Sequence, residues 1–205
     1  FASRICCLSG PSHAEEGARH LPTAVVIAGS SEGLLIELQR LFSNDYFRVY
    51  RSLDMIGVEI GGAVKNIIAI AAGMIDGLGF GDNTIGALIT RGIAEISRLG
   101  ITLGARQETF LGLSGIGDLI TTATSKHSRN RFVGYELGKG NSLASILSTM
   151  KMVAEGVATT RSVQDLSQKL QVEMPITEQI YRVLYEGIDP KAALLQLMTR
   201  DLKSE

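Results

Sequence analysis

Apolar and polar positions follow two different patterns along the 205-residue chain. Up to about Leu53, short apolar runs rich in β-branched and aromatic residues alternate with amphipathic stretches, which indicates strands separated by helices. The runs predict strands over residues 5–8, 23–28 and 47–50, and the stretches predict helices over residues 12–19 and 33–42. Such alternation is typical of the tail of a doubly wound sheet.

From Ile56 onward the apolar positions recur at the helical period, and no strand pattern is convincing. The predicted helices cover residues 56–73, 85–99, 108–113, 143–150, 159–170, 176–185 and 191–198. Pro175 and Pro190 stand at or near helix starts, where a missing N–H costs nothing. We therefore predict an α/β unit over residues 1–54 and an all-α unit over residues 55–205.

The segment from Ile56 to Phe80 is apolar enough to raise the question of a membrane span. It carries Glu59, Lys65 and Asp76 and is repeatedly interrupted by glycine. A membrane-spanning helix needs about 20 apolar residues with few charges. We therefore predict a buried core helix and no membrane association.

The overall composition narrows the function classes. A net charge of −1 and an aromatic fraction of 5% favour neither a nucleic-acid surface nor a stacking platform for single strands. Cys6 and Cys7 are adjacent, which weakly favours a reducing compartment over a disulfide framework. The histidines lack metal-ligand spacing, so we predict no metal site and place them on the surface or in loops.

Lys65 is the most informative residue of the apolar segment. It lies among small and apolar neighbours in Gly61-Gly62-Ala63-Val64-Lys65-Asn66, although lysine is rarely buried without a reason. The structural alternative is a lysine whose stem follows the core while its ammonium reaches water. The functional alternative is a desolvated lysine suited to acid/base work on an alcohol or a carbonyl.

Two further segments carry candidate chemistry. Asp118 follows a glycine-rich turn in Gly115-Ile116-Gly117-Asp118-Leu119, where it is either a helix N-cap or a carboxylate that bonds a substrate hydroxyl or a lysine. The segment Ser128-Arg129-Asn130-Arg131 supplies many donors in a small volume, and arginine suits bidentate contact with phosphate. The alternative for this second segment is a solvated basic loop.

Two glycine-containing segments are weaker. The segment 76–83 contains glycines but follows a helix rather than a strand, so we interpret it as a hinge between two helices and not as a dinucleotide fingerprint. Ser9-Gly10-Pro11-Ser12 stands where a strand turns into a helix, a place that binds anions readily.

Taken in order, these segments resemble the NAD(P)-dependent glycerol-3-phosphate dehydrogenases of bacteria and plants. The resemblance runs from about Leu8 to the end and rests on six motifs: Ser-Gly-Pro-Ser, Gly-Gly-Ala-Val-Lys-Asn, Asp-Gly-Leu-Gly-Phe-Gly-Asp-Asn, Gly-Ile-Gly-Asp-Leu, Ser-Arg-Asn-Arg and Val-Ala-Glu-Gly. It implies the remnant of a Rossmann-type α/β domain followed by a multi-helix C-terminal domain like that of 6-phosphogluconate dehydrogenase. It also implies the interconversion of dihydroxyacetone phosphate and sn-glycerol 3-phosphate with NADH or NADPH.

The resemblance assigns a role to each matching residue. Lys65 would be the catalytic acid/base, and Asp118 would contact the substrate and orient Lys65. The other substrate-binding residues would be Gly10, Ser12, Thr122, Ser128, Arg129 and Asn130. The cofactor-binding residues would be Ala14, Arg129, Val153 and Glu155.

The chain also departs from the family pattern. The strand, glycine-rich phosphate loop and helix with which the family opens are not found, nor is a second lysine expected before Ser9, and His13 stands where the family usually has Phe. We therefore expect an incomplete chain, which starts at Phe1 without Met and without the apolar core of a signal peptide. A homodimer is plausible for the family, and the location would be cytoplasmic, or plastid if a transit peptide is missing.

Two other function classes remain as alternatives. A truncated relative could serve as a non-catalytic helical dimerisation module, because the helical half is intact. A reductase of the hydroxyacid or pantoate type would share the two-domain plan, although the motifs around Lys65 and Arg129 disfavour it.

Overall fold

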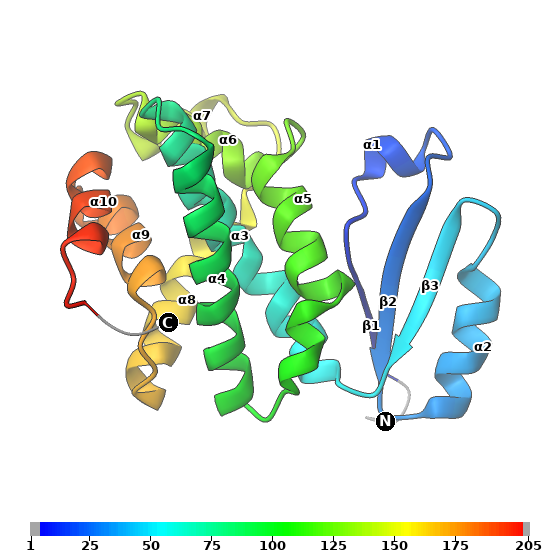
Figure 1. Cartoon of the computed structure of the whole chain (residues 1–205). Helices are drawn as coiled ribbons and strands as arrows, with labels where there is room; N and C mark the ends of the chain where they lie inside the picture. The colour runs from blue at the N-terminus through cyan, green and yellow to red at the C-terminus, as the bar shows by residue number, and fades with distance from the viewer. Residues whose placement is uncertain (1–4, 203–205) are drawn as a thin grey trace.

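The computed structural model describes residues 5–202, in which a small sheet lies beside a larger helical bundle (Figure 1). The sheet has the order β1 (Cys6–Ser9), β2 (Thr23–Gly29), β3 (Phe47–Ser52). β2 and β3 are parallel and are joined by the crossover helix α2 (Glu32–Phe42), whereas β1 runs antiparallel to β2 and reaches it through the single turn α1 (Ala14–Gly17). The expected start of the chain at Phe1 lies outside the described residues, as do residues 203–205.

The sheet unit has a small core of its own. Val25, Ile27, Leu35 and Val49 are almost fully buried against one another, because α2 packs on β2 and β3 on the side away from the bundle (Figure 1). The Ser31 side chain caps α2 by accepting from the backbone N–H of Leu34. The opposite side of the sheet unit is thereby left to face the helices.

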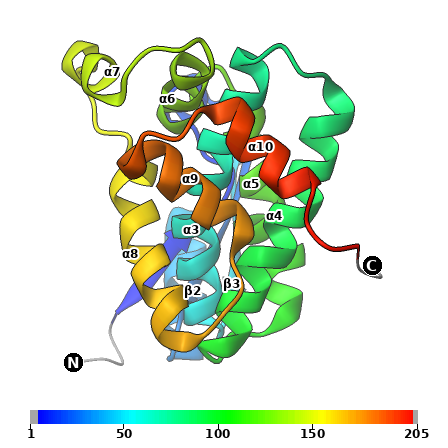
Figure 2. The ribbon, with the colours of Figure 1, turned by 90° about the vertical axis from the view of Figure 1, so that its left-hand side faces the viewer.

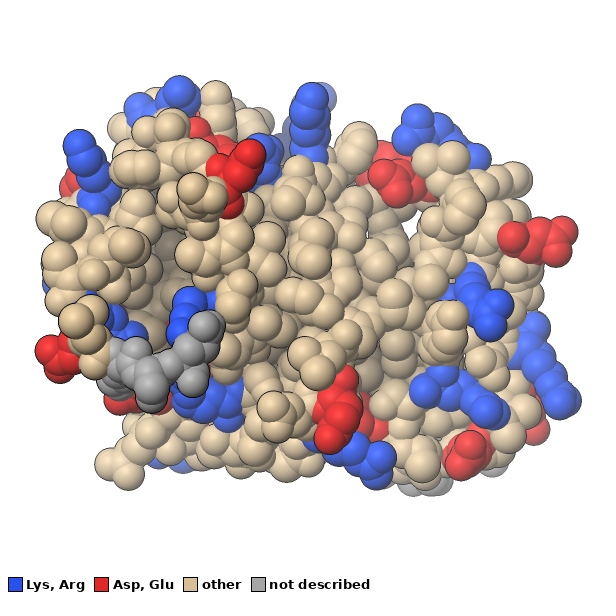
Figure 3. Space-filling model, in the orientation of Figure 1, with Lys and Arg blue, Asp and Glu red and all other residues tan. Residues whose placement is uncertain are grey.

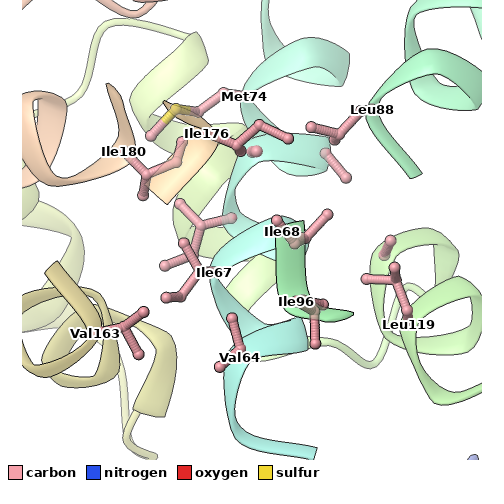
Figure 4. Packing of buried hydrophobic residues seen from close by; sticks show 14 of the residues in the cluster. Val64, Ile67, Ile68, Met74, Leu88, Ile96, Leu119, Val163, Ile176 and Ile180 are labelled. Carbon is pink, nitrogen blue, oxygen red and sulfur yellow. The ribbon is translucent and has the colours of Figure 1, made fainter. Parts of the chain in front are cut away.

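The helical part is built around one apolar helix. Its helices are α3 (Met55–Gly77), α4 (Asp82–Thr102), α5 (Asp118–Thr124), α6 (Arg129–Gly138), α7 (Leu143–Thr149), α8 (Glu155–Leu170), α9 (Pro175–Glu186) and α10 (Pro190–Met198). A 3₁₀ turn (Gln107–Leu111) and a π-helical turn (Leu113–Gly117) precede α5. Figure 2 shows α3 behind α8 and α9, and Figure 4 shows its Val64, Ile67 and Ile68 pointing toward the side chains of surrounding helices.

α3 has a mean hydropathy of 1.6 over its most apolar window and is the one described helix that could cross a membrane by length and composition. In the structure, α4, α5, α6 and α8 pack around it, and Val64, Ile67, Ile68 and Ile70 are no more than 1% exposed. The prediction of a buried core helix is therefore confirmed for this segment. Its apolar composition is accounted for by the core that it forms.

Glycines set the distance between α3 and α6. The two backbones meet at Gly73 and Gly77 on α3 and at Gly134 and Gly138 on α6. A Cβ atom on Gly138 would lie 2.6 Å from the carbonyl oxygen of Met74, well inside contact distance. α6 can therefore lie directly on α3, and the start of α6 is held close to the middle of α3.

Asp54 anchors the start of α3. Its carboxylate accepts hydrogen bonds from the backbone N–H of Gly57 (3.0 Å), the backbone N–H of Arg106 (2.9 Å) and the hydroxyl of Thr109 (2.6 Å). Burial opposes the charged form, but these three bonds outweigh it and lower the pKa of Asp54. One carboxylate thus joins the N-terminus of α3 to the segment after α4.

The prediction of an α/β unit followed by an all-α unit is confirmed, and several details differ. The segment 108–113 is a 3₁₀ turn with the start of a π-helical turn instead of an α-helix, and residues 12–19 form only one helical turn. α5 and α6 were not predicted, because their short sequences lack an apolar stripe. Residues 76–83 connect two helices, as expected, since α3 ends at Gly77 and α4 begins at Asp82.

Candidate functional site

Lys65 lies on α3 with its ammonium held inside the molecule. The side chain is 17% exposed, and Nζ donates to Oδ1 of Asp118 at 2.6 Å and to Oγ1 of Thr122 at 3.0 Å. The ammonium is thus paired with groups of a neighbouring helix, which the alternative of a lysine that only reaches toward water does not require. Two oxygen ligands hold the ammonium, which leaves its third N–H for another acceptor.

Asp118 and Thr122 come from the short helix α5. They are one turn apart, and the Thr122 hydroxyl donates to Asp118 Oδ1 at 3.1 Å, so that Lys65, Asp118 and Thr122 form a closed triangle. Asp118 is 3% exposed. It opens α5 without making a capping bond, so the N-cap alternative is wrong and its charge is directed at Lys65.

Close backbone packing positions this triangle. A Cβ atom on Gly61 would lie 2.5 Å from the carbonyl oxygen of Ser114, in the π-helical turn that leads to Asp118. Any side chain at Gly61, one turn before Lys65, would push that turn away. The glycine thus allows α3 and the approach to α5 to lie in contact, which brings Lys65 and Asp118 within bonding distance.

The segment 128–131 begins α6 instead of forming a solvated loop. Ser128 is its N-cap and accepts from the backbone N–H of Arg131, and Asn130 Oδ1 accepts from the backbone N–H of Gly156 at 2.8 Å. Ser128 and Asn130 are 6% and 4% exposed. Arg131 pairs with Asp76 at 2.5 Å, which ties the start of α6 to the end of α3. Two predicted substrate-binding residues therefore also have structural contacts.

Asn130 lies near α3 as well as near α8. A Cβ atom on Gly156 would lie 2.8 Å from Asn130 Oδ1 and 2.8 Å from the carbonyl oxygen of Asn66, the residue after Lys65. The starts of α6 and α8 therefore meet the middle of α3 at one place. The structure thus brings the segment around Asn130 close to Lys65, although they are far apart in sequence.

The predicted cofactor-binding residues of the helical part have exposed side chains near the starts of α6 and α8, a place that we call the exposed rim of the candidate site. Arg129 and Glu155 form an ion pair at 2.8 Å with side chains 37% and 49% exposed. Val153 precedes α8 and is 71% exposed. These residues are accessible to a ligand, whereas the Lys65 triangle lies deeper.

The sheet unit contributes the loop after β1. Gly10 has φ +141°, a conformation that favours glycine, and the Ser12 hydroxyl donates to the Gly10 carbonyl oxygen at 3.0 Å. A Cβ atom on Gly62 would lie 2.6 Å from Ser9 Oγ, so the end of β1 touches α3 one turn before Lys65. Ala14 follows as the exposed first residue of α1. Within residues 5–202, no hydrogen bond joins this loop to the triangle.

The surface charges of the described residues create no general positive potential around the candidate site. Figure 3 shows acidic and basic side chains interspersed over one face of the molecule, with no large field of one sign. An anion would therefore depend on specific donors rather than on a general positive potential. Arg129 and Lys65 are the cations that the geometry places at the candidate site.

One contact escaped the sequence analysis. His13, expected on the surface or in a loop, has its ring centroid 5.9 Å from that of His127, and its Nε2 is buried with no hydrogen-bond partner among the described residues. Each histidine directly precedes or follows residues predicted to bind substrate, which is the signal that could have suggested a connection. Their contact across the two units follows only from the fold.

The chain was compared with known proteins. A family model described as "NAD-dependent glycerol-3-phosphate dehydrogenase C-terminus" matches residues 54–195. A glycerol-3-phosphate dehydrogenase [NAD(P)+] from Carboxydothermus hydrogenoformans is 57% identical over 205 residues, which cover 100% of this chain and 61% of that protein. A relative of the same name from Citrifermentans bemidjiense is 57% identical over 98% of this chain and 60% of its own length.

Solved structures agree with the sequence relatives. Glycerol-3-phosphate dehydrogenase from Coxiella burnetii superposes with a TM-score of 0.93 at 45% identity, over 95% of this chain and 60% of that one. The Plasmodium falciparum enzyme gives a TM-score of 0.86 at 27% identity, over 97% and 58%. The chain thus spans about 60% of the length of the curated relatives it matches. From the family match over most of its residues and from these relatives, the chain belongs to the NAD-dependent glycerol-3-phosphate dehydrogenase family, whose C-terminal part it contains.

Proposed function

We propose that this chain carries the substrate-binding and catalytic part of an enzyme that interconverts dihydroxyacetone phosphate and sn-glycerol 3-phosphate. The observation that carries the proposal is the contact of Lys65 with Asp118 and Thr122. Burying a carboxylate and an ammonium is costly even when they are paired, so a purely structural role gives little reason to keep them. The contact therefore favours catalysis over a non-catalytic dimerisation module.

The proposed chemistry needs an acid/base at the carbinol oxygen of the substrate. A nicotinamide supplies hydride to the carbonyl carbon, or accepts it in reverse, when bound. Lys65 donates a proton to the carbonyl oxygen of dihydroxyacetone phosphate and takes it back in the oxidative direction. Asp118 and Thr122 hold Nζ in one place, so that its remaining N–H points at the substrate instead of sampling other directions.

The substrate's phosphate would bind at the start of α6. The hydroxyl of Ser128 and the amide of Asn130 use oxygen atoms as acceptors in their present bonds, and their donor hydrogens are not used there. Arg129 adds a guanidinium whose planar fork suits phosphate. Gly10 and Ser12 contribute from the sheet side, and Thr122 is a further contact.

We assign the cofactor, NAD or NADP, to Ala14, Arg129, Val153 and Glu155. Their chemistry fits the group, because an exposed guanidinium, a carboxylate and an apolar side chain lie at one rim. The guanidinium suits cofactor phosphate, the carboxylate accepts from hydroxyl or amide groups, and Val153 offers an apolar contact. These residues would orient the nicotinamide toward the deeper Lys65.

The remaining parts of the proposal concern organisation and location. We place the junction between the α/β and all-α units at residues 54 and 55, supported by the position of Asp54 at the start of α3. We also propose that the protein forms a homodimer, which light scattering would test. The bacterial relatives support a cytoplasmic location, with a plastid as the alternative. The net charge of −1 supports small-molecule partners over nucleic acid or membrane.

The test compares wild type with Lys65→Met and Asp118→Asn, using dihydroxyacetone phosphate with NADH and with NADPH, followed by nicotinamide absorbance. We expect kcat to fall by about 10² to 10⁴ in Lys65→Met, the usual worth of a general acid. Lys169→Met, on the exposed side of α8, is the matched control and should behave as wild type. Wild type that neither reduces dihydroxyacetone phosphate nor binds sn-glycerol 3-phosphate would contradict the proposal.

A further inference from the structure

His13 and His127 meet where the sheet unit and the helical bundle face each other. Their ring centroids are 5.9 Å apart, with the planes tilted by 55°. His13 precedes the single turn α1, and His127 lies in the loop between α5 and α6. The contact therefore joins segments that are 114 positions apart in sequence, one from each side of the candidate site.

The imidazole of His13 is not explained by local structure. It occupies the position before α1 but makes no capping hydrogen bond, and only its backbone carbonyl accepts from Glu16 and Gly17. Its Nε2 is buried without a hydrogen-bond partner in the described part of the chain. A buried polar atom left unpaired costs free energy, so such an atom usually has a ligand or a functional reason.

The neighbours of the two rings indicate what that ligand would be. Consecutive Cα atoms are about 3.8 Å apart, so His13 lies directly beside Ser12 and His127 directly beside Ser128. Both serines belong to the set that we assign to the substrate. A phosphate monoester offers oxygen acceptors, and an imidazole N–H donates to them well.

We infer that His13 and His127 form a phosphate clasp, in which an imidazole N–H from each side of the site donates to a phosphoryl oxygen of the bound substrate. The clasp acts in binding and takes no part in proton transfer to the carbinol oxygen. It rests on the proposed function, because the phosphate ester is the substrate class assigned there. It would give this chain a contact that a Phe at position 13 could not make.

The test uses the whole chain and two probes, sn-glycerol 3-phosphate and inorganic phosphate, with Kd measured by calorimetry. His13→Phe and His127→Phe remove the donors while keeping aromatic volume. His13→Gln keeps an amide N–H near the position of Nε2. His20→Phe is the matched control, because His20 stacks on Tyr46 with centroids 4.3 Å apart and has no part in the clasp.

The expected result is that each clasp variant raises Kd for both probes by about 10-fold or more, the loss that follows from one hydrogen bond to a charged group. His13→Gln should stay within about 3-fold of wild type, since an amide N–H replaces the lost donor. In wild type, nitrogen-resolved NMR should show the His13 and His127 imidazole signals moving as phosphate is added, with the His20 signal unchanged. That readout needs no variant and does not depend on how well a variant folds.

The other outcomes separate this inference from the proposed function. If Arg129→Ala weakens binding of sn-glycerol 3-phosphate while His13→Phe and His127→Phe bind as wild type does, the clasp is refuted and the proposed function stands. Unmoved imidazole signals at saturating phosphate would refute the clasp in the same way. If wild type binds inorganic phosphate through the histidines but not sn-glycerol 3-phosphate, the histidines bind phosphate alone, and the clasp on the substrate fails together with the proposed function. If it binds neither probe, both proposals fail.

Discussion

Replacement of Asp54 by Ala should strongly destabilise the protein, because this residue holds the start of α3 and the segment after α4 together. Asp54 is 7% exposed, and its carboxylate accepts from Gly57, Arg106 and Thr109. Each buried donor left unpaired costs about 1–3 kcal/mol, and water that enters the site would recover part of this. We therefore expect Asp54→Ala to lower the free energy of unfolding by about 4 kcal/mol.

Urea and thermal unfolding at neutral pH would measure this loss, which corresponds to a Tm about 10 °C lower for a domain of this size. Asp54→Asn should lose less, because its amide oxygen still accepts one hydrogen bond. The matched control is Asp45→Ala, since Asp45 is exposed. An Asp54→Ala variant as stable as Asp45→Ala would refute the assignment of Asp54 as the anchor of α3.

The pH dependence offers a second check on Asp54. Its pKa in the folded protein lies below the usual 3.8, so the unfolded chain binds the proton more readily as the pH falls. The stabilisation by the carboxylate is complete above 3.8 and is lost as the pH falls toward the folded pKa. In Asp54→Asn this contribution should be missing, so the difference from wild type should shrink in acid. A constant difference across that window would contradict the lowered pKa.

Two further predictions concern the helical core. Glu95→Ala should lower the free energy of unfolding by roughly 3 kcal/mol, because it leaves buried donors without an acceptor, including the N–H and the O–H of Thr177. Burial raises the pKa of Glu95 above 4.5 despite those bonds. Wild type should therefore lose stability relative to Glu95→Gln as the pH rises from 4.5 through the raised pKa of the folded protein. If urea unfolding gives the two proteins the same dependence of unfolding free energy on pH, this prediction is contradicted. Gly134→Ala should cost at least ~2 kcal/mol, because its Cβ would meet the carbonyl oxygen of Ile70. Gly86→Ala, which has open space in α4, should be neutral or stabilising by up to ~1 kcal/mol, and equal melting temperatures for the two variants would refute the close α3–α6 contact.

The long elements were predictable because their own residues contain the reason for forming them. α3 could be read from a sustained apolar sequence, and β2 from a β-branched run between loop residues. Pro175 and Pro190 mark helix starts that the structure confirms. α5 and α6 escaped prediction because they are short and rich in Thr, Arg and Gly, so their helical state depends on packing against α3. The antiparallel direction of β1 also depends on its partner strand.

In the candidate site, too, the sequence predicted the residue types, whereas their contacts depended on the tertiary structure. The six motifs between Ser9 and Gly156, taken in order, were enough to predict the family, which the comparisons confirm. Their individual states were ambiguous, since Lys65 could have reached solvent and Asp118 could have capped a helix. Only the close approach of Gly61 to Ser114 resolves this, because it brings two distant segments within one hydrogen bond.

The sequence by itself thus determined the alternation of strands and helices, the apolar core helix and the set of reactive side chains, because these depend on the periodicity and chemistry of neighbouring residues. The tertiary structure alone decided that Lys65 is paired, that Ser128 and Asn130 are buried at a helix start, and that His13 lies against His127. The physical reason is that burial and pairing are properties of contacts between segments far apart in the chain. Around the Lys65 site, glycines such as Gly61 and Gly156 allow those segments to approach.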